Sequence, residues 1–264
     1  MQFEFEHQDR RYRFDSRHFH NLALPLRAGG ENPNCYYAQN PDYKVIRFGD
    51  SFVGSVAEGG SVNYFEWTIT PHGNGTHTEC YGHIAKENKT VDTCFEKHLF
   101  FAKVISLEPT QVPSTFEKDT TDSIITLAQI KTALQGDFYL KEKGVEALII
   151  RTLPNQEAKK NRAYSGTNPP YFEATIGTWL AQQEVAHFLT DLPSVDRESD
   201  GGALAFHKNF WQYPQNPRPL ATISELIFVP QEVRDGNYLL SFLLPRWSTD
   251  AVPSQPILYD LLSF

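Results

Sequence analysis

Short apolar and aromatic runs recur along the chain and predict a structure that is rich in strands. Clusters of Gly, Ser, Asn or Asp separate these runs, as is typical of strands joined by turns. In residues 62–70 nearly every position is aromatic or β-branched, which predicts a strand buried on both faces. Residues 145–152 form an almost continuous apolar run, typical of an inner strand. The other predicted strands are residues 44–49, 52–56, 100–109, 221–230 and 237–245.

Two segments have hydrophobic positions at helical spacing. Residues 122–136 begin with a capping aspartate, place apolar side chains three and four positions apart, and end at a glycine. Residues 175–190 also place their larger apolar side chains on one face. Strands precede, separate and follow these helices, which implies an α/β fold with mixed β-sheets and packed helices, in a single domain over residues 1–264. The polar residues 156–174 predict a long loop that borders an active site.

Composition narrows the functional classes. The formal net charge of −8 and the pI near 5.6 argue against a general affinity for nucleic acid or anionic membranes. No apolar run reaches the roughly 18 residues that a membrane helix requires, and the charged N-terminal residues do not resemble a signal peptide. The three cysteines are an odd number without a C-x-x-C pair, which favours free thiols. We therefore expect a cytoplasmic protein.

A cluster of histidines is the main candidate for chemistry. His72, His77 and His83 lie within twelve residues, and Glu79 lies between the second and the third. Imidazole and carboxylate groups bind zinc and harder divalent ions such as manganese. On a strand, His77 and Glu79 would point to the same face. His72 is at an odd offset from His77 and can join them only if residues 73–75 form a turn or bulge.

The segment that contains this cluster, HGNGTHTECYGH, resembles the signature of a known family. That family is the cyclase family of metal-dependent hydrolases, which includes bacterial kynurenine formamidase and isatin hydrolase; its usual pattern is His-x-Gly-Thr-His-x-Asp-x-Pro-x-His. Here the Gly-Thr-His core ends at His77, Glu79 stands in the place of the Asp, and His83 matches the final His. The spacing between His72 and His77 is one residue longer than in the pattern, and Tyr81 replaces the proline.

Four further stretches keep the resemblance in order along the chain. Residues 148–152 resemble the family strand that ends in Arg-Thr, and residues 191–196 are similar to its Asp-x-x-Ser-x-Asp segment. His207 stands where the family has a distal metal histidine, and Glu225 stands where it has a metal-binding glutamate. The resemblance therefore covers most of the chain, from about residue 22 to residue 245.

The resemblance implies a hydrolase that opens an amide, formamide, cyclic imide or lactone with metal-activated water. His83 would be the general acid and base. The partner would be a small-molecule substrate, for which no binding residue is identified. The implied fold is of the swivelling β/β/α type, commonly assembled as homodimers or homotetramers with arms exchanged between subunits. One or two divalent ions, zinc or manganese, would be held by His72, His77, Glu79, His207 and Glu225.

The differences from the family pattern leave other interpretations open. The longer spacing after His72 and the replacement of Asp by Glu79 motivate one alternative, a non-catalytic protein that binds a metal or a small ligand on the same scaffold. A third interpretation is a structural metal that holds a loop in place. Asp191, Ser194 and Asp196 either orient ligands from outside the site or only form a turn.

Overall fold

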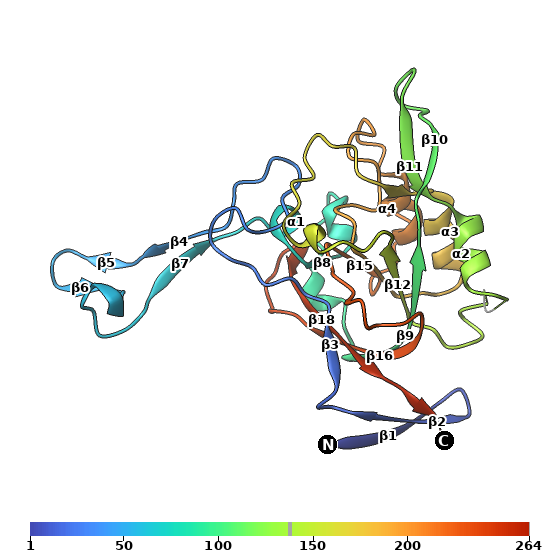
Figure 1. Cartoon of the computed structure of the whole chain (residues 1–264), viewed down its shortest axis with the longest axis horizontal. Coiled ribbons are helices and arrows are strands. Elements are labelled where there is room, and N and C mark those ends of the chain that lie inside the picture. Colours follow the sequence, from blue (N-terminus) through green and yellow to red (C-terminus); the bar gives the residue numbers. More distant parts are fainter. Residues whose placement is uncertain (137–138, 264) are drawn as a thin grey trace.

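A nine-stranded mixed sheet forms the centre of the protein in the computed structural model, which describes residues 1–136 and 139–263 (Figure 1). Four of its inner strands are parallel, and the strands that flank them on both sides are antiparallel. The predicted α/β class with a mixed sheet is confirmed. From one edge to the other, the strands are β17 (Ala251–Pro253), β8 (His77–Glu79), β15 (Thr222–Glu225), β14 (His187–Thr190), β12 (Ala147–Thr152), β9 (Leu99–Leu107), β16 (Gly236–Leu243), β18 (Gln255–Asp260) and β3 (Phe19–Asn21).

The inner strands bury both of their faces, as their apolar sequences predict. In β12, Leu148 and Ile150 face a core that also receives side chains from α3 (Thr175–Gln182) and α4 (Ala205–Trp211). Ala147 and Ile149 alternate with them and face a second core. That core also contains residues of β16 and β18, because the sheet curls. The period of two along β12 thus supplies two cores from one strand.

The two predicted helices are shorter than expected. Residues 121–125 form strand β11 (Thr121–Ile125), which pairs with β10 (Thr110–Pro113), and the helix α2 (Leu127–Ala133) begins only afterwards. Its cap is Thr126, which forms a reciprocal capping box with Gln129, so the prediction of an aspartate cap was wrong. The second segment divides into α3 and β14, because the chain turns between them at Glu184, whose φ is +56°.

Residues 42–68 form an arm that projects from the body of the protein (Figure 1). It consists of β4 (Asp42–Val45) paired with β7 (Phe65–Thr68), and of β5 (Arg47–Phe48) paired with β6 (Phe52–Val53) near the tip. The prediction of a strand buried on both faces was wrong here, because Trp67 is 48% exposed. The aromatic side chains of the arm pack on one another instead, with the Tyr43 and Trp67 rings 5.3 Å apart.

Smaller elements complete the described structure. The hairpin β1 (Gln2–His7) and β2 (Arg10–Asp15) pairs with β19 (Leu262–Ser263), which brings both ends of the chain together (Figure 1). The short strand β13 (Tyr171–Phe172) extends the β10–β11 hairpin. Within the described residues, no helix combines the length and hydrophobicity needed to cross a membrane. The single-turn helices are α1 (Pro71–Asn74), η1 (Val56–Glu58), η2 (Tyr81–His83), η3 (Val91–Thr93) and η4 (Glu157–Asn161).

Candidate metal centre

Strand β8 places two of the predicted ligands on one face. His77 and Glu79 are both completely buried, and Thr78 between them points the other way, to the Ser224 hydroxyl at 2.7 Å. Antiparallel pairing of β8 with β15 sets His77 opposite Glu225. As a result, His77 Nε2 lies 3.4 Å from Glu225 Oε2. The expected shared face of His77 and Glu79 is therefore present, and the sheet register adds Glu225 to it.

The single-turn helix α1 brings His72 to the same place. It starts with Pro71 at the first helical position, and a Cβ on Gly73 would lie only 2.3 Å from the Ala38 side chain, so a glycine is required for this close packing. His72 Nδ1 lies 3.1 Å from Glu79 Oε2. The extra residue before His77 is thus accommodated by a helical turn, and the condition set for His72 is met.

His207 arrives from α4, on the opposite side of Glu79. Asp196 holds the start of this helix, because its carboxylate accepts hydrogen bonds from the backbone N–H groups of Phe206 and His207. The same carboxylate lies 2.6 Å from His207 Nδ1. His207 Nε2 then lies 3.0 Å from Glu79 Oε1. Asp196 therefore orients a predicted ligand from outside the site, which is the first of the two interpretations left open for it above.

The three buried or half-buried histidines share one arrangement. In each, one ring nitrogen faces the carboxylates at the centre and the other faces an outer acceptor. The outer acceptor of His207 Nδ1 is Asp196, that of His77 Nδ1 is the backbone carbonyl of Gly75 at 3.0 Å, and that of His72 Nε2 is Asp250 at 2.9 Å. Histidines that bind metals are typically fixed in this way, because the outer hydrogen bond sets which nitrogen is free to bind.

The inner atoms fit a divalent cation. His77 Nε2 and Glu79 Oε2 are buried, and neither has a hydrogen bond with acceptable geometry to any described residue. One ligand atom each from His72, His77 and Glu79 lie within 4.8 Å of one another, and the same holds for Glu79, His83 and His207. Buried imidazole and carboxylate groups without partners are costly unless a cation or a proton satisfies them. The donor set is one that zinc and manganese accept.

The pKa values of the centre also show that its carboxylates interact with positive charge. Burial alone would raise the pKa of Glu79, but the neighbouring His83, His207 and His72 lower it well below its usual value. Burial alone would lower the pKa values of His72 and His207, yet hydrogen bonds with Asp250, Asp196 and Glu79 raise both to about 10. Without a cation the imidazoles thus supply the positive charge themselves.

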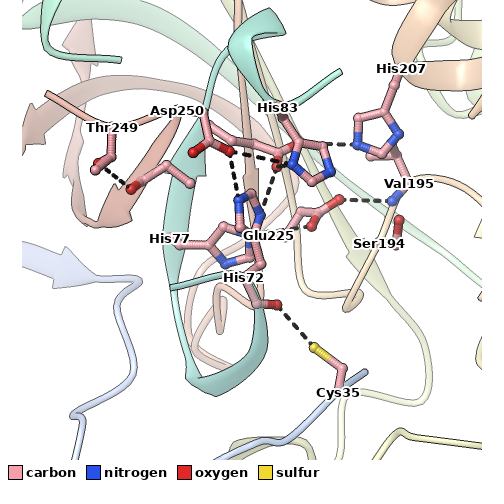
Figure 2. A network of polar contacts seen from close by, with 12 residues as sticks. Cys35, His72, His77, His83, Ser194, Val195, His207, Glu225, Thr249 and Asp250 are labelled. Carbon is pink, nitrogen blue, oxygen red and sulfur yellow. Dashed lines mark hydrogen bonds and ion pairs between the residues drawn. The ribbon is translucent and has the colours of Figure 1, made fainter. Parts of the chain in front are cut away.

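His83 lies at the rim rather than in the floor of the centre. Its side chain is 30% exposed, whereas those of His77 and Glu79 are almost fully covered. His83 Nδ1 lies 3.9 Å from Glu79 Oε2 and 3.4 Å from Asp250 Oδ2 (Figure 2). His83 is therefore a part of the centre that meets solvent. Sequence reasoning missed Asp250, which lies just before β17 and enters the site only through strand pairing.

Three other side chains considered from the sequence contribute to the fold around the centre rather than to its ligands. The buried Asp191 carboxylate accepts hydrogen bonds from Thr152 and from Lys159 at 2.8 Å, so it ties strand ends together away from the ligands. The Ser194 hydroxyl accepts from the backbone of Asp196 and thereby shapes the turn that presents this carboxylate. Cys80 is buried in an apolar cluster, so it packs rather than faces the centre.

Comparison with known proteins places this fold and site in context. The model of the Cyclase family ("Putative cyclase") matches residues 19–197. A solved structure of a potential metal-dependent hydrolase with cyclase activity aligns over 92% of this chain and 98% of its own, with 15% identity and a TM-score of 0.61. An isatin hydrolase bound to the product analogue thioisatinate aligns over 94% of both chains, with 13% identity and a TM-score of 0.61. Isatin hydrolase A from Labrenzia aggregata, bound to benzyl benzoate, aligns over 93% and 94%, with 12% identity and a TM-score of 0.60. No curated protein matches the sequence significantly.

Proposed function

The chain belongs to the Cyclase family, and we propose that it is a metal-dependent hydrolase of a small amide, formamide, cyclic imide or lactone. The observation that carries this proposal is the common orientation of three histidines around Glu79, each with one nitrogen directed inward and the other anchored. A site built only for packing has no need for inward nitrogens beside a buried carboxylate oxygen, Glu79 Oε2, that lacks a hydrogen bond. The similarity of the fold to hydrolases supports the same conclusion.

The proposed ligands are the five side chains expected from the resemblance, namely His72, His77, Glu79, His207 and Glu225. Glu79 is central, because its two carboxylate oxygens face different histidines: Oε1 faces His207 and Oε2 faces His72. This arrangement can hold one ion or two. When bound, a zinc or manganese ion would activate water and polarise the scissile carbonyl.

His83 is suited to move the protons of this reaction. It is the exposed imidazole of the cluster, and it is not one of the five proposed ligands. We propose that His83 accepts the proton of the attacking water and returns it to the nitrogen or oxygen that leaves. The buried positions of His77 and Glu79 exclude bulk water from the opposite side, so the substrate carbonyl has to approach from the rim.

The proposed substrate space is an open cavity of about 910 Å³. It is lined in part by Tyr36, Phe116, Asn168 and Arg197. Tyr36, which is 46% exposed overall, is the lining residue whose hydroxyl is influenced by the centre, because the charge of Glu225 adds to burial of the hydroxyl in raising its pKa. Since aromatic side chains and hydrogen-bonding groups line this cavity together, we propose that it accepts a planar substrate with polar edges.

Metal analysis followed by a panel of substrates tests the proposal. We expect at least one equivalent of zinc or manganese per chain and hydrolysis of at least one member among isatin, formanilide, a lactone and a cyclic imide. Stoichiometric metal without turnover across the panel would favour the non-catalytic binding protein. The longer spacing that motivated that alternative is accommodated by α1, so it no longer counts against activity.

Replacing His83 separates the proposed roles. A His83→Ala variant should retain its metal and lose most turnover, typically about 10²- to 10⁴-fold, because it removes only the proton-transfer group. His18→Ala, which changes an exposed histidine outside the site, is the matched control. Loss of metal from the His83 variant would contradict the assignment of roles.

We propose that the protein assembles as a homodimer or homotetramer through its arm. Tyr43, Phe48, Tyr64 and Trp67 are between 44% and 60% exposed, and exposed aromatic groups of this kind are typical of protein interfaces. Light scattering at several protein concentrations tests this. We expect a mass of two or four chains, reduced to one in a Tyr43→Ser, Trp67→Ser double variant; a monomeric wild-type protein would contradict it.

We also propose that the protein acts in the cytoplasm. Its three cysteines are buried and free, and this use of cysteine is typical of reducing compartments. Fractionation of the native host, followed by immunodetection, tests the location. Recovery with a secreted or membrane fraction would contradict it.

A further inference from the structure

The carboxylate of Asp250 lies between two histidines of the centre. Its Oδ2 atom is 2.9 Å from His72 Nε2 and 3.4 Å from His83 Nδ1 (Figure 2). The rings of His72 and His83 are themselves neighbours, with centroids 4.3 Å apart. One oxygen has two lone pairs and can accept a hydrogen bond from each ring. A single carboxylate therefore contacts both a proposed ligand and the proposed base.

Strand pairing holds Asp250 in this position. It precedes Ala251, which lies opposite Glu79 in the pairing of β17 with β8. The Cys80 backbone N–H donates to the Asp250 carbonyl at 3.0 Å, which continues the same ladder. Gly82 allows the close approach, because a Cβ there would lie 1.9 Å from the Lys89 carbonyl oxygen and 3.3 Å from Asp250 Cβ. The backbone thus fixes where this carboxylate can reach.

The contact with His72 determines which nitrogen faces the centre. A carboxylate accepts hydrogen bonds but donates none, so Nε2 is the nitrogen of His72 that keeps its proton when a cation takes the place of the proton on the other. Nδ1 of His72, which lies 3.1 Å from Glu79 Oε2, is then the nitrogen available to a cation. Asp196 does the same for His207 from the other side of the centre. The two carboxylates are outer partners of two inner ligands.

The contact with His83 has a different consequence. With a proton on Nδ1 directed toward Asp250 Oδ2, the lone pair of His83 lies on Nε2. Nε2 is then free to accept a proton from water. The same carboxylate would also stabilise the positive charge that His83 acquires after the transfer.

We propose that Asp250 is a positioning residue that sets the tautomers of His72 and His83 at once, and so links metal binding to proton transfer. Its effect on metal affinity depends only on the metal centre, whereas its effect on His83 as a base rests on the proposed function. Asp250 itself touches neither the reacting atoms nor, in this proposal, the cation.

An Asp250→Asn variant tests this role, with Asp260→Asn as the matched control. Asp260 also contacts a histidine, His20 at 3.2 Å, but lies in β18, far across the sheet from the centre. Zinc affinity would be measured by competition with a chelating dye, and histidine tautomers by ¹H–¹⁵N NMR of the zinc-loaded protein. Thermal unfolding of both variants reports on folding.

For Asp250→Asn we expect zinc affinity to fall by about 10- to 100-fold, the usual cost of losing an outer carboxylate. We also expect the His83 signal to change from the Nδ1–H form of the wild type toward the Nε2–H form. Asp260→Asn should change neither. These readouts need no substrate, so they stand even if the chain proves to hydrolyse nothing in the panel.

Two results would overturn the proposal. One is zinc affinity within twofold of wild type together with an unchanged His83 tautomer. The other is complete loss of one zinc equivalent without a change at His83, which would make Asp250 a ligand. If Asp250→Asn unfolds early, Asp250→Glu, which keeps the charge, should restore the His83 tautomer; failure to restore it counts against the proposal.

Discussion

Two buried histidines of this protein, His207 and His187, have opposite surroundings. Both are almost completely buried, and Nδ1 of each is held by a neighbour: Asp196 at 2.6 Å for His207 and the Thr222 hydroxyl at 2.8 Å for His187. The remaining nitrogen of His207 faces the Glu79 carboxylate. The ring of His187 instead stacks on Phe95 and lies edge to face against Phe100.

The difference shows that burial alone does not decide the charge of a histidine, because charged partners can outweigh it. Burial lowers the pKa of His187 to about 3, and the charges of Lys97 and Arg218 act in the same direction. The same burial at His207 is outweighed by Asp196 and Glu79, which raise its pKa to about 10. His187 therefore packs as a neutral aromatic ring, whereas His207 lies between two carboxylates that stabilise its protonated form.

The largest expected effect comes from removing the carboxylate that distinguishes the two sites. Glu79→Gln keeps the size of the side chain but takes away the charge faced by His72 and His207. We expect zinc affinity to fall by more than the roughly 100-fold that an outer partner can account for. Equilibrium dialysis measures it. Retention of wild-type affinity would mean that Glu79 is not a ligand.

The next effect concerns pH and His187. Because its folded pKa of about 3 lies below the ordinary value near 6.5, the unfolded chain binds a proton in this interval and the folded chain does not. Stability is therefore lost as the pH falls from about 6.5 toward 3, by about 2 kcal/mol between pH 7 and pH 5. Urea unfolding of wild type and His187→Gln at both pH values measures this, and an equal loss in the two proteins contradicts it.

A smaller effect is expected when Asp196 becomes Asn. The variant keeps an acceptor for His207 Nδ1 but loses the negative charge, so zinc affinity should fall by about 10- to 100-fold. With its carbonyl oxygen in the place of Oδ2, Asn can still accept from the His207 backbone N–H, but its amide NH2 group then meets the Phe206 N–H, so the start of α4 loses one of its two hydrogen bonds to this side chain. Isothermal titration with zinc measures the change. An unchanged affinity would show that Asp196 only caps the helix.

The smallest effect on the metal centre is expected at the corresponding partner of His187. Thr222→Val preserves shape and removes the hydroxyl that contacts Nδ1, which should cost about 1–3 kcal/mol of folding free energy at one buried nitrogen. Zinc affinity should stay at the wild-type value. A change in zinc affinity would mean that the two histidines are not separate in function.

The sequence predicted the local part of the site better than the remote part. His77 and Glu79 could be placed together from strand periodicity, and His72 from the glycines that follow it. His207 and Glu225 were expected only through the family resemblance, because no local spacing links them to β8. Asp250 escaped notice, since it joins the site through the pairing of β17 with β8.

The strands were also predicted unevenly, well in the centre of the sheet and poorly in the arm. Nearly continuous apolar runs correctly predicted the inner strands β9 and β12, because strands buried on both faces have few polar positions. Residues 62–70 have a similar pattern but belong to the exposed arm. A hydrophobic pattern predicts that side chains will pack against other apolar groups. It does not specify whether those groups belong to the same chain or to another molecule. The hairpin of the arm pairs only with itself, so its pattern fits either case.

The late position of Asp250 in the chain has a consequence for synthesis. His72 and Asp250 are separated by 178 positions, so the two are not in contact until nearly all of the described chain has left the ribosome. Chains emerge at roughly 5–20 residues per second, and a segment that folds earlier has β8 without its outer neighbour. Before β17 has paired with β8, Asp250 does not contact His72, so a metal ion could bind to either ring nitrogen of His72. The ordered centre therefore forms only after the 178 positions that follow His72 have been synthesised.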